Sequence, residues 1–178
     1  MFLKKFFSLL VFAVILVPAI CLAAEKPRVA VIPFVDQSPK KGIVLEGDID
    51  TIRDDIANEI DFTGKFRAFT RNEVDKLLAS IKFDNSDLVD PATAAQYGKM
   101  IGVQYLVLGT VNGFKSNKKG DYTAYLSVRM IEVETAEIFY SGRGEGKSND
   151  EMIVALKKAA NDALNGKRGM LTMMRGRK

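Results

Sequence analysis

The residue types that most enzymes use for catalysis are scarce in this sequence of 178 residues. It contains no histidine, and its only cysteine is Cys21. These counts exclude a Ser–His–Asp triad and a Cys–His pair, because both arrangements need an imidazole. They also exclude an ordinary zinc or copper site, because those metals bind imidazole or thiolate ligands. We therefore expect no cofactor, and only carboxylate, lysine, tyrosine and serine side chains remain as candidates for chemistry.

Closely spaced carboxylates are the first of these candidates, because such pairs serve glycosidases and bind hard cations such as Ca²⁺. The pairs are Asp48 with Asp50, Asp54 with Asp55, and Asp84 with Asp87. Asp54 and Asp55 stand beside Ile52 and Ile56 on a predicted helix, where acidic residues usually mark the solvated face. The third pair lies among asparagine and serine, a composition typical of loops. Solvent-facing roles are favoured over an enzyme that uses these pairs.

A glycine-rich segment, residues 141–148, ends in Gly-Lys-Ser and resembles part of a phosphate-binding loop. The position of the first required glycine is occupied by Ser141. Gly142, Gly144 and Gly146 alternate, which is typical of a strand with one bare face against a close neighbour. The pattern favours this structural role over nucleotide binding.

The segment that follows the first predicted strand is a candidate contact surface. Its polar residues are Asp36, Gln37, Ser38, Lys40 and Lys41. A loop at the carboxyl end of a central strand often forms a ligand or partner surface. The alternative is a simple connector between two elements.

The first 24 residues have the layout of a secretory signal peptide, with Lys4 and Lys5 ahead of an uncharged apolar run over residues 6–20. The run is shorter than the roughly 20 residues that span a bilayer comfortably, which disfavours a permanent anchor. Cys21 is a candidate for lipidation, although the bulky Ile20 fits a lipoprotein peptidase poorly. We expect export to the periplasm.

The charge is unevenly distributed along the rest of the chain. Residues 25–166 carry 19 basic and 22 acidic residues, a formal charge of −3. Residues 167–178 form a basic tail that contains five cations and no acid. An acidic body does not fit a nucleic-acid-binding domain. The tail fits either weak contact with an anionic membrane surface or a solvated terminus.

Hydrophobic periodicity and turn signals predict one domain over residues 25–166. Helices are predicted to begin at Asp48, at the capping box of Thr70 and Glu73, at Asp90-Pro91, and near Ser148. Strands are predicted over residues 28–34, 66–69, 103–111, 122–133 and 138–146. The order β-α-β-α-α-β-β-β-α predicts an α/β (α+β) domain with a mixed sheet of about five strands. The first two strands should pair in parallel, and the last three should form an antiparallel meander.

Four segments together resemble the family of the curli-secretion channel lipoprotein (CsgG) and the lipoprotein activators of penicillin-binding proteins (LpoB). They are Val-Ala-Val-Ile-Pro-Phe at 29–34, residues 64–71 from Gly-Lys-Phe to Thr-Arg, residues 98–109, and residues 128–138 with Thr135 at the turn. The resemblance implies an anticodon-binding-domain-like fold and a periplasmic, outer-membrane-associated location. It implies contacts with envelope proteins, either a peptidoglycan synthase or further copies of the chain, and no catalysis.

Two specific functions follow from this resemblance and stay open. One is the regulation of peptidoglycan synthesis, and the other is an oligomeric role in secretion and curli assembly. Residues 110–123 are too few for the spanning hairpin of a channel subunit, since each strand of such a pair needs roughly 9–11 residues. This count favours the non-enzymatic interaction domain.

Overall fold

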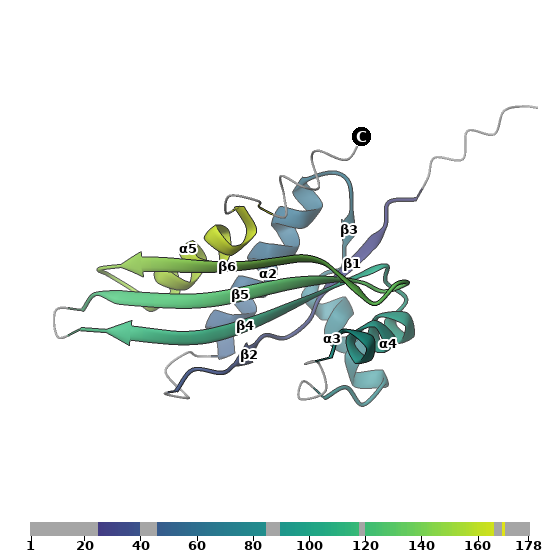
Figure 1. The fold of residues 1–178 in the computed structure, drawn as a ribbon, viewed down its shortest axis with the longest axis horizontal. Coiled ribbons are helices and arrows are strands. Elements are labelled where there is room, and N and C mark those ends of the chain that lie inside the picture. The colour runs from purple at the N-terminus through teal and green to yellow at the C-terminus, as the bar shows by residue number, and fades with distance from the viewer. Residues whose placement is uncertain (1–24, 40–45, 85–89, 118–119, 166–168, 170–178) are drawn as a thin grey trace, which may run out of the picture.

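The computed structural model describes residues 25–39, 46–84, 90–117, 120–165 and 169. These residues form six strands and four helices, arranged as a mixed sheet with helices on both faces (Figure 1). The strands are β1 (Arg28–Val31), β2 (Val35–Asp36), β3 (Arg67–Ala68), β4 (Tyr105–Ser116), β5 (Tyr122–Glu132) and β6 (Glu137–Ser148). The helices are α2 (Glu46–Phe62), α3 (Arg71–Ser80), α4 (Pro91–Ile101) and α5 (Met152–Asn165).

The sheet has the order β3-β1-β4-β5-β6, and β2 also pairs with β4. Strand β1 is parallel to both β3 and β4, whereas β4, β5 and β6 form an antiparallel meander. The predicted fold class, the parallel pair and the meander are all confirmed. Parallel strands need a connection that returns the chain to the end where the first strand began, which a short turn cannot do. The helical crossover between β1 and β3 provides this connection.

The sheet contains one strand more than the sequence predicted, because Pro33 divides the first apolar run. Pairing along β1 ends when Ile32 N–H donates to Val107 O at 3.1 Å. Proline cannot donate to a ladder, so the chain leaves the sheet there and returns as β2 opposite Thr110 and Val111. The predicted strand over residues 28–34 therefore pairs only as far as Ile32, before Pro33, and the separate strand β2 was not predicted.

Two further boundaries differ from the prediction. Helix α2 begins at Glu46, so Asp48 lies in its first turn and does not cap it. Strand β4 runs on to Ser116. A bulge between Val111 and Gly113 changes which of its residues face the core. The predicted strand ended at Val111, because the bulge interrupts the alternation of apolar and polar residues there.

The predicted helix signals around α3 and α4 are confirmed. The Thr70 side chain accepts from Glu73 N–H, and the Glu73 carboxylate accepts from Thr70 N–H at 2.8 Å. Asp90 caps α4, and Gly102 ends it in the left-handed region at φ 74°.

The sheet separates two apolar clusters. On one face, α2 and α5 pack over side chains that include Val107, Leu126 and Leu156. On the other face, α3 and α4 cover a smaller cluster that includes Ile32, Val74 and Leu106. Figure 1 shows α3 and α4 gathered near one end of the long meander and α5 nearer the other end. The far part of the meander therefore has a helix on one face only.

Candidate functional site

The candidate contact segment lies at the sheet edge next to β4. Gln37 N–H donates to Val111 O at 2.9 Å, and Ser38 N–H donates to the Asp36 carboxylate at 2.9 Å. Ser38 is buried, whereas Gln37 is exposed. The structure thus brings Asp36, Gln37 and Ser38 together in a local turn that extends the sheet.

Only part of that segment can act as a surface in this conformation. Because Ser38 is buried, a partner would reach Gln37 and the edge of Asp36. Lys40 and Lys41 lie outside the described residues, as do Cys21 and all of the basic tail at 167–178 except Gly169. Partner binding by this segment stays a prediction.

A buried arginine that the sequence reasoning missed joins α2, α3 and β1. Arg53 is only 3 % exposed, and its Nη2 donates to Asp75 Oδ1 at 2.8 Å and to Val31 O at 3.2 Å. Its Nη1 lies 3.4 Å from Asp50 Oδ1, and Arg71 Nη1 lies 2.5 Å from the other oxygen of Asp50. The cluster holds α2, α3 and β1 together through charge-assisted hydrogen bonds.

The sequence did carry a signal for Arg53. The residue follows Ile49 by four positions and precedes Ile56 by three, so it lies on the apolar face of α2. A charged residue on such a face is rarely left without partners.

Both members of the Asp54 and Asp55 pair have cationic partners, whereas Asp87 of the third pair lies outside the described residues. Asp54 lies 3.4 Å from Arg71 Nε, and Asp55 lies 3.1 Å from Lys157 Nζ. Both aspartates are partly exposed, as the helical pattern predicted. Within the described ranges, no three His, Cys, Asp or Glu side chains cluster closely enough to hold a metal ion.

The glycine-rich segment forms β6, and its glycines face α5. A Cβ at Gly142, Gly144 or Gly146 would overlap the carbonyl oxygen of Ala163, Ala159 or Ala155, respectively. Two residues of a strand advance roughly 6.6 Å and four residues of a helix advance about 6 Å, so the two small-residue rows stay in step. The structure confirms the prediction of a strand with one bare face.

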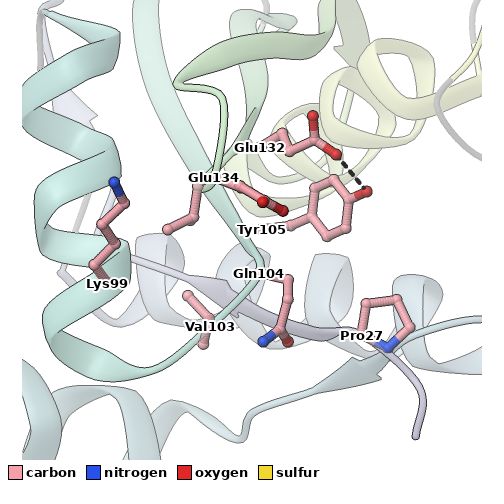
Figure 2. Close-up of a pocket in the computed structure, with 8 residues that line it drawn as sticks. Pro27, Lys99, Val103, Gln104, Tyr105, Glu132 and Glu134 are labelled. Atoms are coloured by element: carbon pink, nitrogen blue, oxygen red, sulfur yellow. Dashed lines mark hydrogen bonds between the residues drawn. The ribbon is translucent and has the colours of Figure 1, made fainter. Parts of the chain in front are cut away.

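An open pocket of about 380 Å³ lies where β4 begins and β5 ends (Figure 2). Tyr105 donates to Glu132 Oε1 at 3.1 Å, and Thr135 donates to the other oxygen of the same carboxylate at 2.9 Å. Gln104 Oε1 accepts from Arg28 N–H at 2.8 Å. Lys99 and Glu134 complete the polar lining.

The polar groups of this pocket mainly hold the sheet end together. Glu132 and Gln104 already accept hydrogen bonds from the protein, and Tyr105 packs edge-on against Phe66 and Phe139. Apart from Pro27, the lining comes from residues 98–109 and 128–138, two of the segments that carried the family resemblance.

The fold is a mixed α/β domain, and the polar groups described above hold its elements together. No described helix has both the length and the apolar character needed to cross a membrane. The family model for the curli production assembly/transport component CsgG matches residues 12–167. The chain belongs to this family.

Solved structures with the same fold include proteins of low sequence identity. Lipoprotein GNA1162 from Neisseria meningitidis matches with a TM-score of 0.55 and 14 % identity, covering 83 % of this chain and 92 % of that one. The PelC dodecamer from Paraburkholderia phytofirmans matches with 0.53 and 14 %, covering 86 % and 90 %. The NMR structure of Escherichia coli LpoB matches with 0.51 and 17 %, covering 69 % and 58 %. A search of curated proteins finds no match.

Proposed function

We propose that this chain is an exported, envelope-associated interaction domain that acts by protein contacts and not by catalysis. Its role would lie in envelope or cell-wall assembly, in the manner of an activator of a penicillin-binding protein. The observation that carries the proposal is the match of residues 12–167 to a family of assembly and transport components. The lack of histidine in the sequence supports the non-enzymatic part.

The proposed location is the periplasm, with association to the outer membrane. Residues 1–24 would direct export, residues 25–166 would form the working domain, and the basic tail at 167–178 would add weak contact with anionic lipid. The intact mass of the chain purified from cell envelopes tests this processing. A mass equal to that of a chain that starts at residue 25 supports cleavage after residue 24. A mass equal to that of a chain that starts at Cys21 and carries a lipid would instead show cleavage before Cys21 and its lipidation.

The activator-like role can be measured with purified components. The full chain is mixed with a purified bifunctional peptidoglycan synthase from the same cells, and glycan polymerisation and cross-linking are followed with labelled lipid-linked precursor. We expect saturable stimulation of at least twofold. A chain that neither binds nor stimulates any of the synthases of those cells would contradict the activator-like role.

A second candidate function is an oligomeric component of a CsgG-type secretion or curli assembly system. The matching PelC structure is a dodecamer, so this fold assembles into twelve copies in that protein. Native mass spectrometry and sedimentation of the full chain in mild detergent test this candidate. A closed oligomer of fixed size supports it, whereas a monomer at all concentrations contradicts it.

A further inference from the structure

The far part of the meander exposes a polar face that no described helix covers. Ala124, Leu126 and Val128 of β5 point toward α5, so Tyr125 and Arg129 point to the opposite side. On that opposite side the cluster beneath α3 and α4 reaches only to Leu108 and Ile131. We call the uncovered area the outer sheet face and define it by Lys115, Tyr125, Arg129, Arg143, Glu145 and Lys147.

The strand registers arrange these side chains around Tyr125. Its direct neighbours across the sheet are Gly113 on β4 and Glu145 on β6. Lys115 lies on the next row, with its Nζ 5.5 Å from the centre of the Tyr125 ring. Lys147 lies on the same row as Lys115, two strands away and therefore roughly 10 Å from it. Gly113 brings no side chain to the β4 side of the ring, and a Cβ there would lie 3.9 Å from Pro39.

The outer sheet face is basic, although the body of the protein is acidic overall. Four cations share it with a single carboxylate, Glu145, which lies 2.9 Å from Lys147 Nζ. Within the described part of the chain, Arg143 and Arg129 have no carboxylate within ion-pairing distance. Uncompensated cations clustered on one side of a molecule attract anions and steer their approach.

We propose that the outer sheet face binds an acidic polysaccharide, with sugar carboxylates on its cations and a sugar ring against Tyr125. An aromatic ring supplies a flat apolar body with a polar tip, which suits the mixed surface of a sugar. The hydroxyl and amide groups between the cations fit sugar hydroxyls; Asn112 already donates to Ser127 there at 2.6 Å.

The same features disfavour three other anionic partners. A membrane-binding surface needs apolar side chains that insert below the headgroups, and none of the six defining residues is aliphatic. Single-stranded nucleic acid is usually held by successive aromatic stacks, whereas this face has one aromatic ring. An acidic protein would normally contribute to a buried apolar centre, which a flat polar face cannot complete.

Binding at such a face must come from several weak contacts at once. An exposed ion pair contributes little by itself, so a polymer that engages all four cations gains by multivalency. The Debye length falls from about 30 Å at 0.01 M salt to about 8 Å at 0.15 M, so binding should weaken strongly with added salt.

The test measures retention of the full chain, purified in mild detergent, on immobilised polygalacturonate and on uncharged dextran. The double variant Arg143→Gln/Lys147→Gln removes two cations from the outer sheet face. Arg67→Gln/Lys76→Gln removes the same charges from β3 and α3, where both side chains are exposed, and is the matched control. Tyr125→Leu removes the aromatic ring without changing charge.

We expect binding to polygalacturonate but not to dextran, with at least tenfold weaker binding after Arg143→Gln/Lys147→Gln and about threefold weaker binding after Tyr125→Leu. The Arg67→Gln/Lys76→Gln control should stay within twofold of the unmodified chain. Equal loss in both double variants would overturn the proposal. The proposal would also be overturned if the chain bound single-stranded DNA or phosphatidylglycerol vesicles as tightly as polygalacturonate and Tyr125→Leu did not change that binding. Melting by circular dichroism verifies that every variant is folded.

Discussion

Arg53 links three elements through one side chain, so its loss should be costly. Replacing Arg53 with alanine leaves Val31 O and the Asp75 carboxylate without their donor, and it opens space beneath α2. Removing one partner of a buried ion pair typically costs about 3–5 kcal/mol, and the half-exposed Asp75 places this case near the lower limit. We expect Arg53→Ala to lower the free energy of unfolding by about 3 kcal/mol in urea titrations.

The control for Arg53 is Arg67→Ala, because Arg67 is an exposed arginine on the neighbouring edge strand. Its removal should change stability by less than ~0.5 kcal/mol. Similar losses in the two variants would show that Arg53 makes no special contribution.

Position 144 has no room for any side chain larger than the hydrogen of glycine. A methyl group there would meet the backbone of α5 at Ala159, which cannot move without separating helix from strand. Such overpacking usually costs about 1–3 kcal/mol, so we expect Gly144→Ala to lower the free energy of unfolding by ~3 kcal/mol. Thermal melting measures the effect.

Gly47→Ala is the matched control for Gly144→Ala. A Cβ at Gly47 meets nothing within 4 Å, and the residue lies within α2. Alanine has a higher helix propensity than glycine, so this variant should be as stable as the unmodified chain or up to ~1 kcal/mol more stable. If Gly144→Ala is equally well tolerated, the close approach of β6 and α5 does not exist.

Among the elements, α3 owes its start to the capping box of Thr70 and Glu73. The hydrogen bonds from Thr70 lower the pKa of the Glu73 carboxyl below its usual value. A carboxyl whose pKa is lower in the folded state stabilises the fold above its unfolded pKa, and this contribution is lost as the pH falls through the folded value. Glu73→Gln should therefore be less stable than the unmodified chain at pH 7 and closer to it near pH 2.

The pH experiment uses urea midpoints of both proteins at pH 7 and pH 2. Asp90→Asn is a parallel case, because hydrogen bonds from Thr93 likewise lower the pKa of the Asp90 carboxyl. Thr70→Ala, which removes the cap itself, should cost about 1 kcal/mol at pH 7. A gap between Glu73→Gln and the unmodified chain that widens at pH 2 would contradict this account.

Strand β6 forms one edge of the sheet, and two α5 side chains cover part of that edge. Glu145 N–H donates to Asp162 Oδ2 at 3.0 Å, and Lys158 Nζ donates to Lys147 O at 2.9 Å. Free edge groups are templates for pairing with another chain. We expect Lys158→Ala/Asp162→Ala to increase concentration-dependent association in sedimentation velocity experiments.

The matched control also removes one cation and one anion, but from residues that do not contact the β6 edge. Asp55→Ala/Lys157→Ala breaks the ion pair between α2 and α5 and keeps the net charge equal. Its sedimentation should match that of the unmodified chain. If both double variants associate alike, the edge groups are not the cause.

At the scale of the whole molecule, the two apolar clusters share the same strands. Adjacent residues of β1 and β4 belong to opposite clusters, as Leu106 and Val107 show. Neither cluster can lose its strand without exposing the other, so unfolding should be a single cooperative transition. Val74→Ala and Leu156→Ala each change one of the two clusters. In each variant, the urea midpoints followed by far-ultraviolet and by near-ultraviolet circular dichroism should fall by the same amount. Separate midpoints for the two signals would contradict this expectation.

The sequence predicted what depends on residue type and local spacing. The alternating Gly142, Gly144 and Gly146 indicated a bare strand face, and Thr70 with Glu73 indicated a helix start. The capping box joins residues close in the chain, and the glycine alternation follows the two-residue period of a strand, so both can be recognised before the partner helix is known. The order of elements followed in the same way and led to the correct fold class.

Only the tertiary structure decided which side chains meet across the sheet. Arg53 and Val31 are 22 positions apart, and their contact depends on how α2 crosses β1. Strand β2 exists because β4 continues past β1 and offers free partners at Thr110 and Val111. The outer sheet face likewise depends on registers and on where α4 ends, because pairing between distant strands is fixed by the packed core and not by local propensity.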